Sequence, residues 1–338
     1  MKAIVLQKNG KPSVLKVKEI PDPHPAENEV LVRLQFSGIN YAEILSRKGL
    51  YSWAPKKPYV LGMEGAGIIE DVGSKVDKNR IGEKVVVGAQ YGCYAQTIAV
   101  HHQQALPTLD FYDMKENAAF LVNFMTAWIS MFELGKIKSE DIVLISPAAG
   151  GVGSAAVLLA AKAGCSVFGL AGSDEKIELI KKLGANDGFN YRNRNWFDEV
   201  KNRVGGADLI LEMVGGDIYR KCFELLNPYG RMAVAGFASL DLKIWNPLSW
   251  WQTWRDIPRV NLMDVAIKSS GVFATHLGYL LKDREKLQQA YQHMIEFINE
   301  NKIKPVIGKV FPFDKAAEAH AFIESRQSTG KILLQQEV

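Results

Sequence analysis

The sequence predicts an α/β protein in two parts, a β-rich part followed by a doubly wound parallel sheet. Up to about residue 120, short apolar runs are separated by Gly, Pro and Asn, which is typical of strands and turns. From residue 141 onward, strand-like runs alternate with helix-like runs, which is typical of βαβ units. A chain of 338 residues has room for two such domains.

The β-rich part is expected to hold one short helix, Tyr41–Lys48, among its strands. A longer apolar helix, Asn117–Leu134, follows and ends at Gly135. The apolar runs that predict strands are Lys2–Leu6, Glu29–Phe36, Gly67–Val72, Lys84–Val87 and Tyr94–Val100.

The second part is expected to form parallel strands that are joined by helices. The predicted strands are Asp141–Ser146, Ser166–Leu170, Gly188–Tyr191, Asp208–Met213, Arg231–Ala235 and Ser270–His276. The predicted helices between them are Gly153–Ala163, Glu175–Leu183, Trp196–Arg203 and Ile218–Leu226. The tail predicts a helix, a strand, a second helix and a last strand, over Arg284–Asn299, Lys309–Phe313, Asp314–Ser325 and Lys331–Gln335.

Composition and charge exclude several classes of protein. The net charge is only +4 and no basic block occurs, so nucleic acid is not an expected partner. No run of about 18 apolar residues is present, so no transmembrane segment is expected, and the N-terminus lacks the pattern of a signal peptide. The three cysteines, Cys93, Cys165 and Cys222, lie far apart in the sequence, which excludes a CxxC site and favours a reducing, cytoplasmic setting.

The stretch SPAAGGVGSA, Ser146–Ala155, resembles a glycine-rich turn that binds dinucleotides. Gly150 and Gly153 occupy the second and third glycine positions of the G-x-G-x-x-G pattern, where the backbone approaches a pyrophosphate and the helix packs on the strand. Ala148 replaces the first glycine, which alanine can do outside the left-handed region. Because the turn joins a predicted strand to a predicted helix, a phosphate site is favoured over a glycine turn that binds nothing.

The end of the second predicted strand bears on which dinucleotide binds. An acidic residue is expected there in NAD sites, whereas this chain has Ala171–Ser173, followed by Lys176. A hydroxyl and a cation at this place favour the 2′-phosphate of NADPH. Asp174 and Glu175 oppose that interpretation, although acidic residues are also ordinary in a first helical turn. Tyr191, which ends the third strand, either flanks the same phosphate or caps the sheet edge.

A set of motifs runs from residue 37 to the C-terminus. The motifs are Ser37–Tyr41, Gly49–Tyr51, Gly62–Gly67, Asn123–Trp128, Ala148–Gly153, Lys182–Ala185 and Thr329–Lys331. With these motifs the whole chain resembles the medium-chain dehydrogenase/reductase superfamily, in particular its zinc-free quinone oxidoreductase (zeta-crystallin-like) group. Further stretches are most similar to the vesicle amine transport protein branch, namely Trp250–Trp251, Thr275–Leu280 and Lys304–Pro305.

The resemblance implies a fold and an assembly. A GroES-like catalytic domain would comprise residues 1–122, completed by residues 278–338, and a Rossmann domain would comprise residues 123–277. The nicotinamide would bind in the cleft between the two domains. A homodimer would form along the last Rossmann strand.

The resemblance also implies chemistry without zinc. Zinc-dependent relatives carry cysteine and histidine ligands at positions matching Asn40 or its neighbours and Met63, and methionine is a poor zinc ligand. The expected reaction is hydride transfer from NADPH to a quinone or another α,β-unsaturated carbonyl compound, because such an acceptor delocalises the incoming charge without a metal. The alternative is a nucleotide-binding, vesicle- or membrane-associated protein with little catalytic turnover.

Candidate site residues follow from the same matches. Asn40 and Tyr51 would flank the substrate carbonyl, with Tyr51 as a candidate hydrogen-bond or proton donor. The segment Trp245–Trp254 holds four of the seven tryptophans and is expected to cover the substrate site or a dimer contact, with a membrane-surface patch as the alternative. The predicted NADPH-binding residues are Asn123, Thr126, Ala149, Gly150, Gly151, Val152, Gly172, Ser173, Lys176, Tyr191, Gly236, Phe237, Ala238, Val272, Phe273, Ala274 and Arg326.

Overall fold

The computed structural model describes residues 1–236 and 255–336. The chain divides into two compact units. The first comprises Met1–Val122 together with Lys304–Val338, and the second comprises Asn123–Ile303. The second unit is therefore an insertion within the first. This division keeps residues 278–303 with the second unit, whereas the sequence analysis assigned them to the first.

The second unit is built on a six-stranded sheet with the order β11-β10-β9-β12-β13-β14, and all neighbouring strands run parallel. The order reverses between β9 and β12. In such doubly wound sheets, ligands bind beyond the carboxyl ends of the strands at the reversal point. The predicted Rossmann sheet is thereby confirmed. Its strands are β9 (Ile142–Ser146), β10 (Ser166–Ala171), β11 (Asp187–Asn190), β12 (Ala207–Glu212), β13 (Leu226–Val234) and β14 (Gly271–Ala274).

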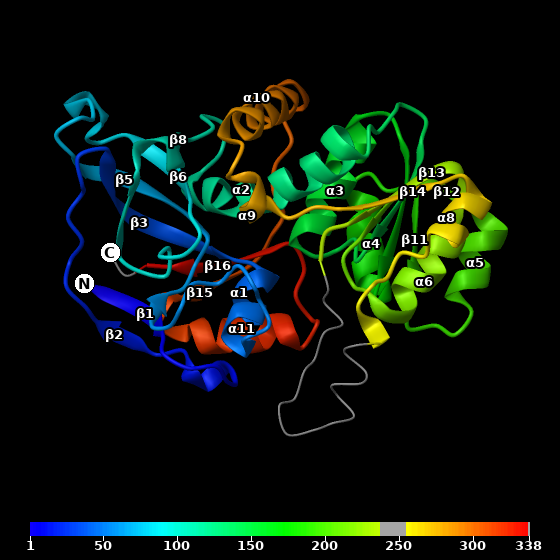
Figure 1. The fold of residues 1–338 in the computed structure, drawn as a ribbon, viewed down its shortest axis with the longest axis horizontal. Coiled ribbons are helices and arrows are strands. Elements are labelled where there is room, and N and C mark those ends of the chain that lie inside the picture. Colours follow the sequence, from blue (N-terminus) through cyan, green and yellow to red (C-terminus); the bar gives the residue numbers. More distant parts are fainter. Residues whose placement is uncertain (237–254, 337–338) are drawn as a thin grey trace. The chain divides into compact units, whose positions relative to one another are not determined.

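Helices cover both faces of this sheet. In Figure 1, α3 and α4 lie on one face, while α5, α6 and α8 lie on the other. This arrangement follows from right-handed crossovers, which change face where the strand order reverses. The helices that cover the sheet are α3 (Gly151–Lys162), α4 (Asp174–Lys182), α5 (Trp196–Arg203), α6 (Gly216–Glu224) and α8 (Leu262–Lys268). The unit also contains α9 (Leu277–Leu280) and α10 (Arg284–Asn301).

The first unit contains a larger sheet and a smaller one. The larger has the order β15-β16-β3-β5-β6-β8, with β7 also paired to β3, and the smaller has the order β2-β1-β4. Because β16 of the tail pairs antiparallel with β3, the C-terminal segment completes a sheet that begins near the N-terminus. The strands are β1 (Lys2–Leu6), β2 (Val17–Glu19), β3 (Glu29–Ile39), β4 (Tyr59–Val60), β5 (Glu64–Val72), β6 (Lys84–Gly88), β7 (Thr97–His101), β8 (Ala105–Pro107), β15 (Ile307–Pro312) and β16 (Lys331–Gln335).

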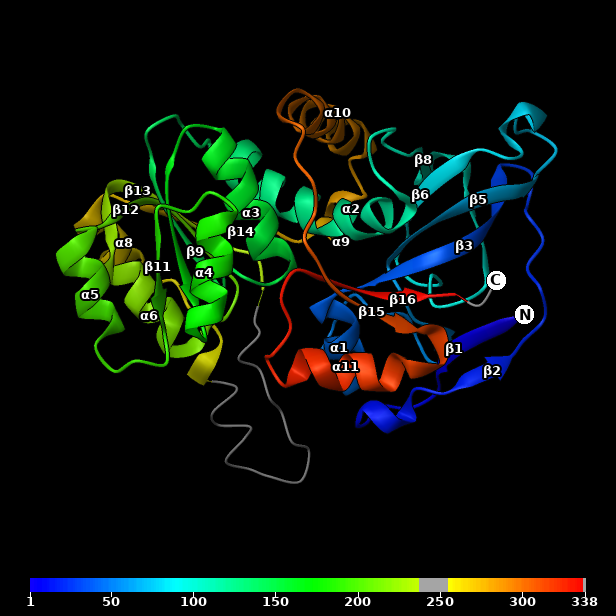
Figure 2. The same cartoon turned by 180° about the vertical axis from the view of Figure 1, so that it is seen from behind.

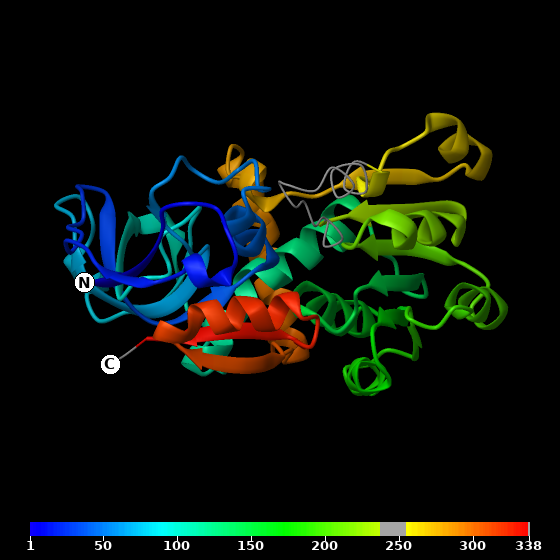
Figure 3. The ribbon, with the colours of Figure 1, turned by 90° about the horizontal axis from the view of Figure 1, so that it is seen from below.

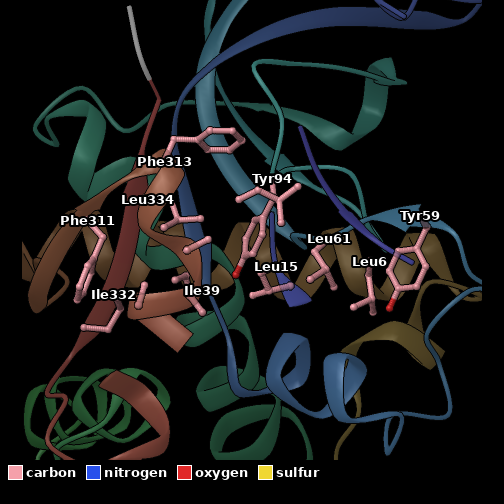
Figure 4. Close-up of a cluster of buried hydrophobic side chains, with 13 residues drawn as sticks. Leu6, Leu15, Ile39, Tyr59, Leu61, Tyr94, Phe311, Phe313, Ile332 and Leu334 are labelled. Atoms are coloured by element: carbon pink, nitrogen blue, oxygen red, sulfur yellow. The ribbon is translucent and has the colours of Figure 1, made fainter. Parts of the chain in front are cut away.

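A buried hydrophobic cluster ties the tail to the N-terminal strands of the first unit (Figure 4). Leu6 of β1, Ile39 of β3 and Phe311 of β15 belong to it. Helix α11 (Ala316–Glu324) lies against β15 and β16 (Figure 3) and beside α1 (Tyr41–Lys48) in both Figures 1 and 2. The buried Arg47 of α1 forms an ion pair with Glu324 of α11. Since a buried cation needs a partner, this pair fixes α1 against α11.

The long helix predicted over residues 117–134 begins three residues earlier, and its last six residues are π-helical. Helix α2 covers Met114–Trp128, and a π-helical segment, η4, covers Ile129–Leu134. Trp128 stacks on Phe132 with ring centroids 4.0 Å apart, and Phe297 of α10 packs on both rings at 5.6 Å. These ring contacts explain why α10 belongs to the second unit.

Among the described α-helices and strands, five were not predicted, namely α8, α9, β2, β4 and β8. The three strands hold two or three residues each, which is too few to show a strand period. Helix α8 exposes Leu262, Met263 and Ile267, so its apolar residues do not mark a face buried in the unit. In the described ranges, no helix is both long and apolar enough to cross a membrane.

Candidate active site

The glycine-rich turn after β9 forms an open cradle at the N-terminus of α3. Gly150 precedes the helix with φ −79° and ψ −176°, and a Cβ added there would meet nothing within 4 Å. A Cβ on Gly151, by contrast, would lie 2.6 Å from the side-chain nitrogen of Asn123. The first N–H groups of a helix have no partner within the helix and attract anions. The turn therefore fits a pyrophosphate group, with Asn123 beside it.

The positions of Gly153 and Ala148 explain the altered glycine pattern. A Cβ on Gly153 would lie 2.0 Å from the Pro147 carbonyl oxygen, so the helix approaches the strand too closely for any side chain. Ala148 is fully buried and its φ is not positive. Its methyl group would lie 2.6 Å from a Cβ on Gly169 of β10. Gly169, on the neighbouring strand, thus leaves the space that the Ala148 methyl group occupies.

Glu212, which the sequence analysis did not identify, organises the reversal point of the sheet. It ends β12 beside Ser146 of β9, and its side chain is fully buried. Its Oε1 accepts hydrogen bonds from the backbone N–H groups of Val214 at 2.6 Å and Gly215 at 3.0 Å. Burial raises the pKa of this carboxyl to about 7, although the hydrogen bonds oppose the shift. The only signal in the sequence is an acidic residue that ends an apolar run.

Polar and cationic side chains gather at the carboxyl end of β10. A Cβ on Gly172 would lie 2.6 Å from the Tyr191 hydroxyl oxygen and 3.5 Å from Arg192 Nε. Lys176, in the first turns of α4, is half-buried. Burial and then the positive charge of Arg192 lower the pKa of this lysine. The structure thus groups the predicted Gly172, Tyr191 and Lys176 around Arg192, which the sequence analysis did not include.

A buried polar network joins α1, β5 and β16 in the first unit. Lys331 Nζ donates to Asn40 Oδ1 at 2.6 Å and forms an ion pair with Glu64. Asn40 Nδ2 in turn donates to Glu64 Oε1 at 3.1 Å. Glu43 accepts from the backbone N–H groups of Asn40 at 2.8 Å and Met63 at 2.9 Å. Lys331, Glu64 and Asn40 are thus joined by mutual hydrogen bonds, as buried ions require, whereas burial raises the pKa of Glu43 to about 7.

This network does not fit a zinc ion at the positions that bind zinc in the dehydrogenases. The Asn40 amide oxygen and the Glu64 carboxylate both face the Lys331 ammonium, and its positive charge would repel a metal ion. Methionine, at position 63, is a poor zinc ligand. Within the described part of the chain, no three His, Cys, Asp or Glu side chains are grouped as a metal site.

The other predicted site residues are distributed over both units. In the first unit, Tyr51 follows α1, and its ring meets Trp53 edge-on with centroids 6.4 Å apart. Arg326 also belongs to the first unit and has a φ of 59°. In the second unit, Thr126 lies on α2 and Ser173 precedes α4.

Further predicted residues of the second unit lie in the turn after β9, in the first turn of α3 or at the ends of β13 and β14. Those in the described ranges are Ala149, Val152, Gly236, Val272, Phe273 and Ala274. Phe237, Ala238 and the tryptophan-rich segment 245–254 lie outside the described residues.

Comparison with known proteins bears on the family. The model of the alcohol dehydrogenase GroES-like domain matches residues 26–110, and that of zinc-binding dehydrogenase matches residues 183–334. Quinone oxidoreductase of Sus scrofa is 32% identical over 99% of this chain and 97% of its own length. Synaptic vesicle membrane protein VAT-1 homolog of Rattus norvegicus is 31% identical over 99% of this chain and 84% of its own length. The structure of Escherichia coli quinone oxidoreductase complexed with NADPH has a TM-score of 0.87 at 28% identity, with 99% of this chain and 100% of that chain covered.

A GroES-like unit that carries an inserted Rossmann unit with a glycine-rich turn defines the oxidoreductases of the medium-chain dehydrogenase/reductase class. The chain belongs to that superfamily, in its zinc-free quinone oxidoreductase group. The resemblance predicted from the motifs is confirmed. The donor set at Asn40 and Met63 agrees with the zinc-free group, even though the matched model takes its description from zinc-binding members.

Because Glu212 is buried with a raised pKa, its ionisation makes the folded state less stable. The folded state binds this proton more tightly than the unfolded state, so the stability from the protonated form is present below about pH 4.5 and is lost as the pH rises through about 7. We expect Glu212→Gln to reduce the loss of unfolding free energy between pH 5 and pH 8 by on the order of 2 kcal/mol. Urea titrations at pH 5 and pH 8 measure the unfolding free energy of both proteins. Glu178→Gln, at an exposed position of α4, is the control, and an equal pH dependence in Glu212→Gln and the wild type would contradict the assignment.

Proposed function

We propose that this protein is an NADPH-dependent reductase that transfers hydride to a quinone or another α,β-unsaturated carbonyl compound without zinc. The observation that carries the proposal is the pairing of an open phosphate cradle at Gly150 with a cationic strand end at Gly172. Lys176 and the Tyr191 hydroxyl suit a 2′-phosphate, and Ala171 stands where NAD sites place a carboxylate. The structures of quinone oxidoreductases from Escherichia coli and Thermus thermophilus in complex with NADPH support the same choice.

The cradle and its neighbours would hold NADPH along the carboxyl edge of the sheet. The backbone of Ala149 to Val152 would bind the pyrophosphate at the N-terminus of α3. Asn123 and Thr126 would contact the nicotinamide ribose, and Arg326 is proposed as a further contact to the adenosine phosphate. The nicotinamide would lie against the ends of β13 and β14, at Gly236 and Val272–Ala274. When bound, NADPH supplies the hydride.

The first unit would act on the carbonyl end of the substrate. Addition of a hydride to a conjugated acceptor leaves negative charge on its carbonyl oxygen, and a proton from Tyr51 or from water completes the reduction. A phenol can donate that proton, whereas the side-chain amide of Asn40 cannot. The Asn40 amide is held by Lys331 and Glu64, so Asn40 is proposed to flank the substrate carbonyl and not to transfer a proton.

The reductase activity can be tested by the loss of NADPH absorbance with a panel of acceptors. We expect turnover with 1,4-benzoquinone, 9,10-phenanthrenequinone or a simple enone, and a lower kcat/KM with NADH than with NADPH. Tyr51→Phe removes one proton donor, so we expect a roughly tenfold or larger decrease in kcat. The KM for NADPH should stay unchanged in this variant, because Tyr51 is not assigned to the coenzyme.

The same assay separates the enzyme from the alternative function. If NADPH binds but no acceptor in a wide panel is reduced above the uncatalysed rate, the enzyme proposal fails. The observation would then favour a nucleotide-binding protein with little turnover. That alternative is suggested by the name of the VAT-1 homolog relatives, synaptic vesicle membrane protein.

A homodimer along β14 is proposed from the edge of the second unit. Strand β14 pairs with β13 on one side, and no other strand among the described residues pairs with its second side. Beside it, α8 exposes Leu262 by 77%, Met263 by 67% and Ile267 by 80%. An unpaired edge strand next to a clustered apolar surface is typical of an interface. A second copy related by a two-fold axis would cover both features at once.

Light scattering of the purified protein tests this assembly. We expect the mass of a dimer for the wild type and of a monomer for Ile267→Glu, because the new carboxylate would be buried without a partner at the interface. Ile81→Glu is the matched control, since Ile81 is also exposed, by 49%, but lies in the first unit. A wild-type protein that is monomeric at micromolar concentrations would contradict the proposal.

A further inference from the structure

Arg192 lies at the carboxyl end of β10, and its charge acts on Lys176 of α4. Arg192 Nε would lie 3.5 Å from a Cβ on Gly172, and the charge of Arg192 contributes to the lowered pKa of Lys176. Like charges repel when they converge. Such an approach is unfavourable in the protein alone and becomes favourable when an anion lies between the cations.

The carboxylates next to these cations do not neutralise Arg192. In residues 1–236 and 255–336, no carboxylate forms an ion pair with Arg192. The nearest acidic residue on α4, Asp174, accepts a hydrogen bond from Asn190 Nδ2 at 3.2 Å. Glu175 at the same helix end has a lowered pKa, chiefly because Ser173 donates a hydrogen bond to it. Asp174 and Glu175, the two acidic residues that oppose a phosphate site in the sequence, thus interact with the neutral side chains of Asn190 and Ser173.

The turn after β11 fixes the backbone of Arg192 in this place. The Arg192 N–H donates to Asn190 Oδ1 at 3.1 Å, and the Asn193 N–H donates to the Asn190 carbonyl oxygen at 2.9 Å. Asn190 therefore links the turn to α4 through Asp174 and fixes the backbone from which the Arg192 side chain extends. The Tyr191 hydroxyl lies over Gly172 from the same turn.

We propose that Arg192 is a coenzyme-specificity residue, which binds the 2′-phosphate of NADPH together with Lys176 and the Tyr191 hydroxyl. This inference rests on the proposed function and adds a residue that the sequence motifs did not assign. The planar guanidinium offers paired donors that match a phosphate. Gly172 is required because any side chain there would occupy the space between the strand end and the Tyr191 hydroxyl.

The test compares coenzyme affinities of the wild type, Arg192→Gln and Arg194→Gln. Arg194 is a matched control because it lies in the same turn and is also exposed, while only Arg192 influences the pKa of Lys176. Dissociation constants for NADPH, NADH and 2′,5′-ADP are measured by calorimetry. We expect Arg192→Gln to weaken the binding of NADPH and 2′,5′-ADP about tenfold and to leave the binding of NADH unchanged. Arg194→Gln should leave all three unchanged.

Two outcomes would overturn the inference, and they are distinguishable. If the wild type prefers NADPH over NADH but Arg192→Gln keeps that preference, then Arg192 does not bind the phosphate, although the proposed NADPH function stands. If the wild type binds NADH and NADPH equally, the proposed coenzyme fails and the specificity role of Arg192 fails with it. An equal loss of NADH and NADPH affinity in Arg192→Gln would indicate a structural role for the turn and would also contradict the inference.

Discussion

The second unit depends on the close approach of α3 to β9 at Gly153. Without a side chain at this position, the first turn of the helix lies directly on the Pro147 carbonyl oxygen. That contact aims the unpaired N–H groups of the helix at the carboxyl edge of the sheet, where the strand order reverses. The buried methyl of Ala148 and the bare backbone of Gly169 complement each other beside it. The cradle at Gly150 stays open as a consequence.

The first unit depends on a buried ion pair between Lys331 and Glu64. Lys331, Glu64 and Asn40 come from three distant parts of the sequence and meet through hydrogen bonds. The ammonium of Lys331 is buried against the Glu64 carboxylate and the Asn40 amide oxygen, where its positive charge opposes the binding of a metal ion. A fixed ammonium cannot accept a substrate oxygen as a ligand, whereas an open zinc site can. This difference agrees with the proposed acceptors, which need no Lewis acid.

The sequence predicted the Rossmann alternation, the glycine-rich turn and the family, because each has a local signal in spacing or motif. It did not predict the network partners of Asn40, since Lys331 reaches that residue only through the pairing of β16 with β3. Glu212 was missed because its role arises from burial at the end of a strand. Arg192 was missed because its nearness to Lys176 depends on how β11 pairs with β10. Contacts between residues that are far apart in the sequence leave no periodic pattern in it, so they could not be predicted.

In the proposed function, the turn at Gly150 binds the pyrophosphate of NADPH. The most direct measurement is the affinity for NADPH of Gly150→Asp, with thermal unfolding as a check on the fold. Aspartate suits the position before a helix, and a Cβ there meets no other atom, so we expect the melting temperature to be unchanged or higher. The new carboxylate would repel the pyrophosphate, and we predict a loss of affinity of about 100-fold or more. A folded Gly150→Asp variant that binds NADPH as tightly as the wild type would contradict the account.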